Sequence, residues 1–166
     1  GAGPSGSVAA GILKRQSANI DVLVLEKGQF PRFSIGESLL PQSMAYFEEA
    51  GMLQAIVEEG FQFKNGAQFS CRGHRMHFDF REKFSPGWGT TFQVQRAHFD
   101  QILIEQAGKQ GAQVRFLQEV TAYHYDEATK KCWVTVLDHA SGEPYQVVAN
   151  FVLDASGFAR VFPRLL

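Results

Sequence analysis

Apolar side chains recur at helical spacing in several separate stretches of the chain. Residues 4–15 and 96–110 have the spacing of three and four residues that places apolar side chains on one helix face. Between them, Ser38 as a cap and Gly51 as a stop predict a third helix, followed by a short helix over 52–59. The predicted apolar faces consist of Val8, Ala9, Ile12 and Leu13, then Leu40, Met44 and Phe47, then Phe99, Ile102, Leu103 and Ala107.

Compact runs of branched and aromatic residues predict the strands. The run IDVLVLE at 20–26 is typical of a buried parallel strand, and residues 113–116 form a shorter one. Two extended runs within 66–80 meet at Gly73 as a hairpin, and residues 90–95 are extended. Further runs at 119–126, 132–138 and 144–149 predict an antiparallel meander, and residues 151–154 predict a last buried strand. Strands and helices in this order predict an α/β fold with a parallel sheet and a three-stranded antiparallel meander.

The composition is ordinary for a globular domain. Of the 166 residues, 45% are hydrophobic and 20% are charged. A formal net charge of −1 gives no electrostatic reason to expect nucleic acid or a membrane surface as partner. The two cysteines lie in different segments, no apolar run approaches the roughly 18–20 residues of a membrane span, and no signal peptide is visible. We therefore expect a cytoplasmic protein. No metal site is predicted, because Cys71 and His77 share a face only if Gly73 does not turn the chain.

The chemistry begins at the glycine-rich segment Gly1-Ala2-Gly3-Pro4-Ser5-Gly6, which has the spacing G-x-G-x-x-G. The first glycine permits a tight turn, the second a close approach of a pyrophosphate, and the third close packing of helix and sheet. Glu26 ends the next strand roughly 20 residues later, where a carboxylate accepts from ribose hydroxyls. Glycines, helix, strand and acid in this order predict a dinucleotide site; the alternative is a tight turn that binds nothing.

The pattern after Glu26 favours FAD over NAD. A NAD-binding domain would continue as alternating strands and helices, whereas here a loop, paired helices and antiparallel ribbons come before the next parallel strand. The chain also starts on the first glycine of a motif that normally follows a strand. We therefore expect a fragment, residues 1–166 being part of a Rossmann-like FAD-binding domain whose first strand and C-terminal part are missing.

Three segments together resemble a known family. Gly1 to Gly6, Glu26-Lys27 and the stretch Phe30 to Pro41 (FPRFSIGESLLP) look like the opening of flavin-dependent halogenases, a branch of the aromatic-hydroxylase-like flavoprotein superfamily. Asp154-Ala155-Ser156-Gly157 is similar to the D-A-S-G segment with which that family returns to the nucleotide domain. The resemblance implies FAD as cofactor and a role in FAD binding for most of these residues.

The roles that the resemblance implies fall along the length of the cofactor. Gly1, Gly3, Ser5 and Gly6 would line the pyrophosphate, Glu26 would hold the adenosine ribose, and Gly36, Glu37 and Ser38 would lie near the flavin. The family's pattern also places Lys27, Arg32, Arg96, the backbone of Val120, Asp154, Ala155 and Gly157 at the cofactor.

Three of these assignments have plainer alternatives. Arg96 stands at the positive end of its own helix dipole, where a cation destabilises the helix, so we expect it to bind an anion. The alternative is a solvated surface arginine. For Arg32, the alternative to a cofactor role is an ordinary basic residue in a Pro-containing loop. For Glu37, the alternative is an acidic residue that stabilises the first turn of the helix that Ser38 begins.

The same resemblance implies redox chemistry on a small organic substrate through a flavin hydroperoxide. In a hydroxylase NAD(P)H reduces the flavin, whereas in a halogenase reduced flavin comes from a partner reductase and hypohalous acid passes to a lysine. Lys64 aligns near the position of that family lysine, although an alternative alignment places Gln68 at the same position. The plain alternative for Lys64 is a lysine in a surface turn. Residues 61–95 would form an antiparallel insertion on the substrate side. A dehydrogenase or reductase, or a nucleotide-binding domain without turnover, is the alternative function.

Overall fold

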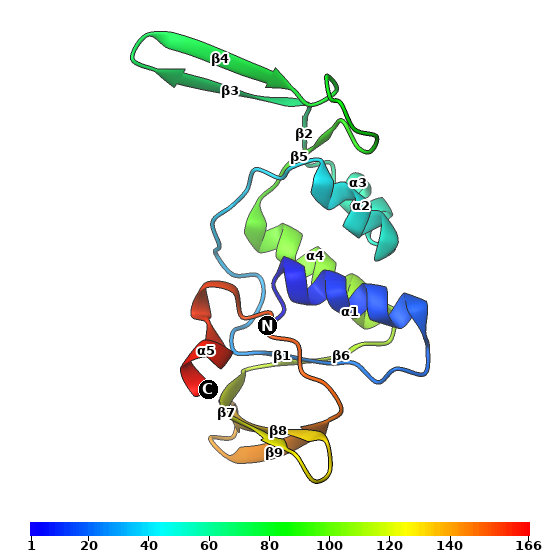
Figure 1. The fold of residues 1–166 in the computed structure, drawn as a ribbon, viewed down its shortest axis with the longest axis vertical. Coiled ribbons are helices and arrows are strands. Elements are labelled where there is room, and N and C mark those ends of the chain that lie inside the picture. The colour runs from blue at the N-terminus through cyan, green and yellow to red at the C-terminus, as the bar shows by residue number, and fades with distance from the viewer.

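The computed structural model describes residues 1–166, and its elements form a stack from a projecting hairpin at one end to a meander at the other (Figure 1). In chain order they are α1 (Pro4–Gln16), β1 (Leu23–Glu26), α2 (Gln42–Glu49), α3 (Leu53–Glu58), β2 (Gln62–Lys64), β3 (Gly66–Cys71), β4 (His74–Asp79), β5 (Thr91–Gln93), α4 (Arg96–Lys109), β6 (Gln113–Phe116), β7 (Gln118–Asp126), β8 (Lys131–Asp138), β9 (Pro144–Ala149) and α5 (Val161–Leu165).

A parallel strand pair and two long helices form the centre. β1 pairs with β6 in parallel, from Leu23 opposite Gln113 to Glu26 opposite Phe116, while α1 and α4 pack against each other above the pair (Figure 1). Phe99 of α4 is fully buried, and its ring meets that of Phe47 edge-on at 5.5 Å. The crossover from β1 to β6 therefore closes around a continuous apolar core, as expected for parallel strands.

The meander lies on the other side of the parallel pair. Its strands have the order β7-β8-β9 and are antiparallel, as predicted. The terminal helix α5 rests on β7, where the rings of Tyr123 and Phe162 lie 4.7 Å apart. An α/β fold with a parallel pair and antiparallel sheets is thus confirmed. No helix has the length and apolar character that a bilayer span requires.

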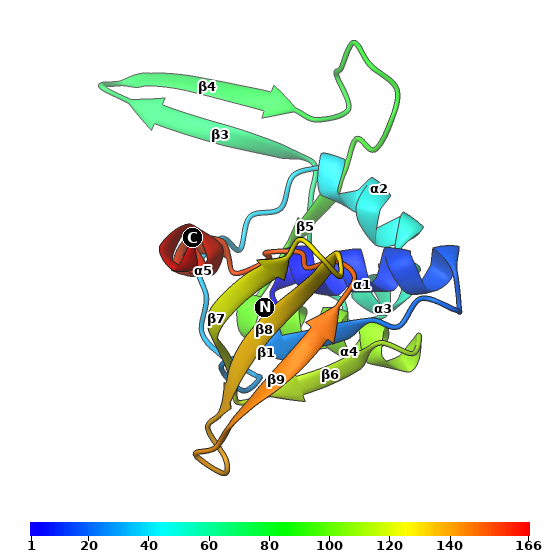
Figure 2. The same cartoon turned by 60° about the horizontal axis from the view of Figure 1, so that its bottom comes forward.

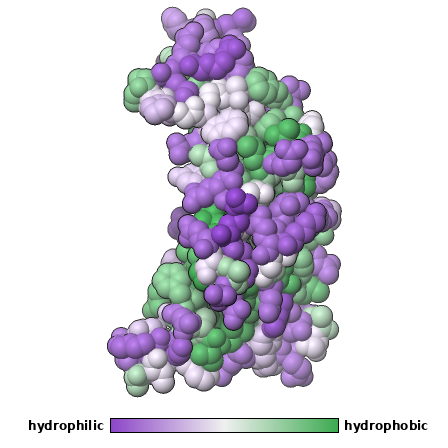
Figure 3. Space-filling view, turned by 90° about the vertical axis from the view of Figure 1, so that its right-hand side faces the viewer, coloured by the Kyte–Doolittle hydropathy of each residue, from purple (hydrophilic) through white to green (hydrophobic).

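The hairpin β3–β4 projects away from the rest of the molecule (Figures 1 and 2). Its register places Ala67, Phe69, Met76 and Phe78 on one face, since Ala67 lies opposite Phe78 and Phe69 opposite Met76. Phe69, Met76 and Phe78 are each more than half exposed. The β2–β5 pair at its base connects it to the body. Elsewhere, the side face of the molecule in Figure 3 is mostly hydrophilic, with apolar patches between the polar side chains.

The predicted helix start at Ser38 is wrong. The helix α2 begins at Gln42, with Pro41 as its preceding residue, while Ser38 is extended and forms an isolated bridge with Gln93. The reason is local, because proline disfavours helical geometry at the residue before it, here Leu40. The fixed φ of Pro41 suits the helix start itself.

The predicted buried strand at 151–154 is also wrong. No backbone hydrogen bond joins these residues to another strand, and Phe151 and Leu153 are 79% and 57% exposed. A strand needs a neighbour for its N–H and C=O groups, and neither β1 nor β9 provides one here. The strand predicted over 20–26 is shorter than expected for a related reason, since β6 offers partners only to Leu23–Glu26.

Candidate functional site

The glycine-rich segment forms a turn that leaves no room for a side chain at Gly1 and Gly6. A Cβ on Gly6 would lie 1.9 Å from the carbonyl oxygen of Gly1, and a Cβ on Gly1 would lie 2.7 Å from that of Ala155. Gly3 precedes the first residue of α1, Pro4, and no side chain caps this end of the helix. The N-terminal amide groups of α1 and the exposed Ser5 are therefore open to an anion, which the helix dipole favours.

Glu26 supports this turn from the end of β1. The residue is only 9% exposed, and its Oε2 accepts a hydrogen bond from the Ala2 amide at 2.8 Å. Its Oε1 accepts another from the Gly28 amide at 2.9 Å. The sequence predicted a ribose ligand at this position but not the bracing contact with the glycine turn. Each oxygen keeps a further lone pair for a ligand hydroxyl.

Arg32 lies over the same turn. Its Nη2 is 3.8 Å from the place that a Cβ on Gly3 would take, and its guanidinium stacks on the ring of Phe30 at 4.8 Å. Its Nε is buried without a hydrogen-bond partner, because the nearest Glu26 oxygen is 3.9 Å away. A buried donor without a partner is uncommon in proteins, and a bound anion would satisfy it.

Lys27 and Val120 lie at the edge of this region. Lys27 donates to Glu119 at 2.7 Å, and His139 lies 2.8 Å from the other oxygen of the same carboxylate. Hydrogen bonds from Lys27 and His139 hold the pKa of Glu119 below its ordinary value. Val120 follows on β7 at the start of a bulge. This network joins the end of β1 to the meander.

The segment Asp154–Gly157 returns to the glycine turn, as the resemblance implied. The Ala155 side chain lies 3.2 Å from the place that a Cβ on Gly6 would take, and Gly157 has a φ of +59°. Asp154 accepts hydrogen bonds from the amides of Ser156 (2.8 Å) and Phe162 (3.3 Å). Burial raises the pKa of Asp154, but the hydrogen bonds from Ser156 and Phe162 outweigh it, so that the pKa lies below its ordinary value.

Arg96 is held by its own helix and by the loop before α2. Its Nε and Nη2 donate to the two oxygens of Asp100 at 2.7 and 3.0 Å, and its Nη1 donates to the carbonyl of Ile35. The Arg96 side chain is 15% exposed and that of Asp100 is fully buried. The alternative of a solvated surface arginine is therefore wrong. Sequence reasoning missed Asp100, although the spacing of four residues on one helix was a usable signal.

The loop at Gly36–Ser38 runs beside Arg96. Gly36 has a φ of +91°, and a Cβ on it would lie 3.1 Å from the Arg96 Nη1. The carbonyl of Glu37 accepts from the Val94 amide at 2.8 Å, and the Glu37 side chain is exposed. Because α2 begins only at Gln42, the alternative of Glu37 as a first-turn acid is wrong.

Lys64 reaches the same loop from β2. Its ammonium group donates to Ser38 Oγ at 2.6 Å and to the carbonyl of Leu39 at 2.9 Å, and lies 5.1 Å from the centre of the Phe80 ring. Lys64 is half-buried and paired with Thr91, so the alternative of a surface turn lysine is wrong. Gln68 lies instead on the exposed hairpin.

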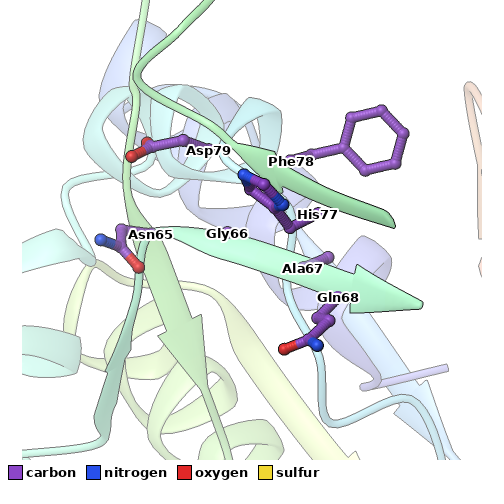
Figure 4. Close-up of a pocket in the computed structure, with 7 residues that line it drawn as sticks. All are labelled: Asn65, Gly66, Ala67, Gln68, His77, Phe78 and Asp79. Atoms are coloured by element: carbon purple, nitrogen blue, oxygen red, sulfur yellow. The ribbon is translucent and has the colours of Figure 1, made fainter. Parts of the chain in front are cut away.

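Two hollows lie near the hairpin. The one drawn in Figure 4 measures about 320 Å³, and polar Asn65, Gln68, His77 and Asp79 surround it at the hairpin base. A larger cleft of about 460 Å³ lies between the start of α2 and the segment 78–88, with Pro41, Phe80 and Trp88 in its walls. Of the predicted positions the first hollow contains only Gln68, the alternative to Lys64, whereas the second shares Phe80 with Lys64.

The predicted site residues thus gather in two groups. The glycine turn, Glu26, Arg32 and the segment 154–157 form the first, and the loop at 36–38 with Arg96 and Lys64 forms the second. Lys27 and Val120 lie beside the first group on the side of the meander. The glycine cradle and the unpaired Arg32 donor fit a bound dinucleotide.

Comparison with known proteins agrees with this geometry. Residues 1–161 match the family described as FAD binding domain. The tryptophan 2-halogenase of Chondromyces crocatus is 34% identical over 159 residues, which cover 96% of this chain and 29% of that protein. The sulochrin halogenase of Aspergillus terreus is 36% identical over 69% of this chain and 20% of its own length. The chain therefore spans less than a third of these relatives.

Solved structures show the same fold. A flavoprotein/dehydrogenase from Cytophaga hutchinsonii superposes with a TM-score of 0.92 at 41% identity, covering 99% of this chain and 40% of that one. CmlS, a flavin-dependent halogenase, superposes with a TM-score of 0.83 at 31% identity, covering 95% of this chain and 28% of its own.

Proposed function

Because the chain belongs to the FAD binding domain family, we propose that it holds FAD in a halogenase-like flavoenzyme that acts on a small organic substrate. The domain is Rossmann-like in this proposal, with the diphosphate on the glycine turn and the start of α1. The observation that carries it is the cradle in which Gly1 and Gly6 leave no room for a Cβ while the amides of α1 stay open.

The other cofactor contacts follow from the two groups of residues. Gly1, Gly3, Ser5 and Gly6 line the diphosphate, Glu26 binds the ribose, and Lys27 and Val120 border the adenine. Asp154, Ala155 and Gly157 flank the nucleotide, and Gly36, Glu37 and Ser38 meet the flavin. FAD supplies the redox chemistry when bound, by activating dioxygen once it is reduced.

Lys64 is the residue that favours halogenation over other flavin chemistry. Its amine is held by Ser38 and Leu39, the loop assigned to the flavin end, and one of its three donors remains free. An amine at this position can bind hypohalous acid and orient it toward a substrate. Gln68 cannot take this part from the exposed hairpin.

Residues 61–95 contribute the substrate side of the enzyme. Phe80 lines the cleft between the start of α2 and the segment 78–88, and the centre of its ring lies 5.1 Å from the Lys64 ammonium group. The cleft combines Phe80, Trp88 and Pro41 with polar and charged side chains, and its volume of about 460 Å³ suits a small organic molecule. The reducing equivalents come from a separate flavin reductase or from NAD(P)H.

A dehydrogenase is the second candidate, supported by the similarity to the Cytophaga hutchinsonii flavoprotein/dehydrogenase. In a dehydrogenase reaction Lys64 takes no part in the chemistry and only holds the loop at 36–38 through its hydrogen bond to Ser38. The two candidates therefore differ in what they require of the lysine.

The test uses the intact protein with FAD, a reductant for the flavin, oxygen, bromide and an electron-rich phenol as probe. We expect brominated phenol in the mass spectrum, and its loss in Lys64→Ala and Lys64→Met without loss of bound FAD. NAD(P)H-dependent flavin reduction without halogenation, equal in wild type and Lys64→Met, would support the dehydrogenase. Wild-type protein that takes up no FAD contradicts the proposed function altogether.

A further inference from the structure

Thr91 places a buried hydroxyl group opposite Lys64. The residue is 1% exposed, and its Oγ1 is buried without a hydrogen-bond partner. In the antiparallel pair of β2 and β5, Thr91 is the register partner of Lys64. Side chains of directly opposite residues lie on the same face of such a pair, with Cβ atoms about 4.5–5.5 Å apart. The hydroxyl therefore lies on the same face of the sheet as the lysine side chain.

The hydroxyl of Thr91 is not explained by packing. Burying a polar group without a hydrogen bond is unfavourable, and the great majority of buried polar atoms have a partner. A valine has nearly the same shape as a threonine and would fill this position of β5 without the unpaired oxygen. The unpaired hydroxyl therefore points to a contact that the side chain makes with a neighbouring donor.

The amine of Lys64 is such a donor. Two of its three N–H groups donate to Ser38 Oγ at 2.6 Å and to the carbonyl of Leu39 at 2.9 Å. Both acceptors belong to the loop before α2, so these bonds tie the amine to that loop and not to the sheet. The flexible four-carbon stem of a lysine allows the third N–H to reach an acceptor on the neighbouring strand.

The strand that carries Thr91 is bonded along both edges. Along one edge β5 pairs with β2, and along the other the carbonyl of Phe92 accepts from the Leu39 amide at 3.2 Å. The hydrogen bond between Lys64 and Ser38, in contrast, is exposed. A hydroxyl on the buried central strand is thus the more rigid of the two anchors for the amine.

We propose that Thr91 is a positioning residue for Lys64. After a rotation of the lysine side chain, the Thr91 hydroxyl accepts the third N–H of the amine and fixes the amine to β5 as well as to the loop at 36–39. This inference rests on the proposed function, since only halogenation requires a defined position of the amine. Thr91 acts through Lys64, because a group held in place reacts faster with a bound molecule than a mobile one.

Two substitutions separate the hydroxyl from the shape of the side chain. Thr91→Val removes the hydroxyl and keeps the shape, whereas Thr91→Ser keeps the hydroxyl. Thr135→Val is the matched control, a threonine of β8 in the meander. All are compared with wild type in the intact protein with FAD, by bromination of the phenol probe and by nitrogen NMR of the lysine ammonium groups. The Lys64 signal is the one that Lys64→Met loses.

We expect the Lys64 ammonium protons to exchange with water about tenfold faster in Thr91→Val, since one hydrogen bond to a charged group is lost. The kcat for bromination falls by a similar factor, while the KM for the phenol and the affinity for FAD stay unchanged. The denaturation midpoint is unchanged or higher, because the buried unpaired oxygen is gone. Thr91→Ser and Thr135→Val behave like wild type in proton exchange and in turnover.

Several results would overturn the assignment. Wild-type exchange and turnover in Thr91→Val would do so, as would a loss of turnover in Thr91→Ser or Thr135→Val as large as that in Thr91→Val. A lower denaturation midpoint of Thr91→Val would show that the hydroxyl stabilises the fold itself, which also contradicts a positioning role.

Failure of the proposed function has a different signature. Wild type that binds FAD without brominating the phenol contradicts halogenation, while faster proton exchange in Thr91→Val still supports the contact with Lys64. Wild type that takes up no FAD contradicts the proposed function altogether. The exchange rates of wild type and Thr91→Val then decide the contact by themselves, since they require neither cofactor nor turnover.

Discussion

At the scale of single residues, Gly6 has the least free space around it in the candidate site. A Cβ added there would lie 1.9 Å from the Gly1 carbonyl oxygen and 3.2 Å from the Ala155 Cβ, and the Gly1 backbone cannot move aside easily. We expect Gly6→Ala to lower the free energy of unfolding by about 1–3 kcal/mol, the usual cost of overpacking. Chemical denaturation measures the change, and titration with FAD measures the loss of the cradle.

Gly108→Ala is the matched control for this substitution. Gly108 lies near the end of α4, and nothing is within 4 Å of a Cβ there. Alanine favours helix over glycine, so the control should be neutral or stabilise the protein by up to about 1 kcal/mol. Equal stabilities of the two variants would show that the turn is not as tightly packed as described.

Residues whose role depends on their spacing along the chain could be predicted from the sequence. The glycines of the turn and Glu26 belong to this class, because a short motif defines what each must do. The partners of Arg32, Lys64 and Arg96 could not all be predicted in this way. Lys64 meets Ser38 across 26 positions and Arg96 meets Ile35 across 61, distances over which the sequence alone specifies no contact.

At the scale of elements, the hairpin β3–β4 carries apolar side chains that contribute little to the fold. Phe69 is 58% exposed, whereas Phe99 in α4 is fully buried. We expect Phe99→Ala to destabilise the protein by about 3–5 kcal/mol, since it removes a large side chain from the core. Phe69→Ala should change the free energy of unfolding by less than about 1 kcal/mol.

Thermal and chemical unfolding of the two variants measure this difference. A loss of several kcal/mol on truncation of Phe69 would mean that the hairpin folds back onto the body, contrary to its projection in Figures 1 and 2.

The periodicity of apolar residues correctly predicted the elements that pack against another part of the chain. It failed for the segment 151–154, which has no adjacent strand to pair with. Helices α1 and α4 and the meander follow from their spacing, since each buries one face on another part of the chain. Residues 151–154 have the same apolar pattern as a buried strand, yet no strand lies beside them and they stay unpaired. Helix α2 starts only at Gln42 because Pro41 disfavours helical geometry at the residue before it. The prediction of Ser38 as the cap did not take this restriction into account.

At the scale of the whole molecule, one carboxylate connects the N-terminal strand to the meander. Glu119 on β7 binds Lys27, just after β1, at 2.7 Å and His139, just after β8, at 2.8 Å. These hydrogen bonds hold its pKa below the ordinary value of 4.5. A depressed pKa in the folded state means that the contribution to stability is present above the unfolded-state pKa and is lost as the pH falls through the folded-state pKa.

We therefore expect the stability of the protein to decline below about pH 4.5, in part through Glu119. The Glu119→Gln variant should unfold at a lower denaturant concentration than wild type at pH 7, and the two midpoints should converge as the pH falls toward 3. Because Lys27 is 65% exposed, salt should also reduce the difference at pH 7. Glu127→Gln, in an exposed pair with Lys130, is the control and should leave the pH dependence unchanged. A constant gap between Glu119→Gln and wild type over the whole range would show that Glu119 acts through packing and not through its charge, and that the link between β1 and the meander does not depend on this ion pair.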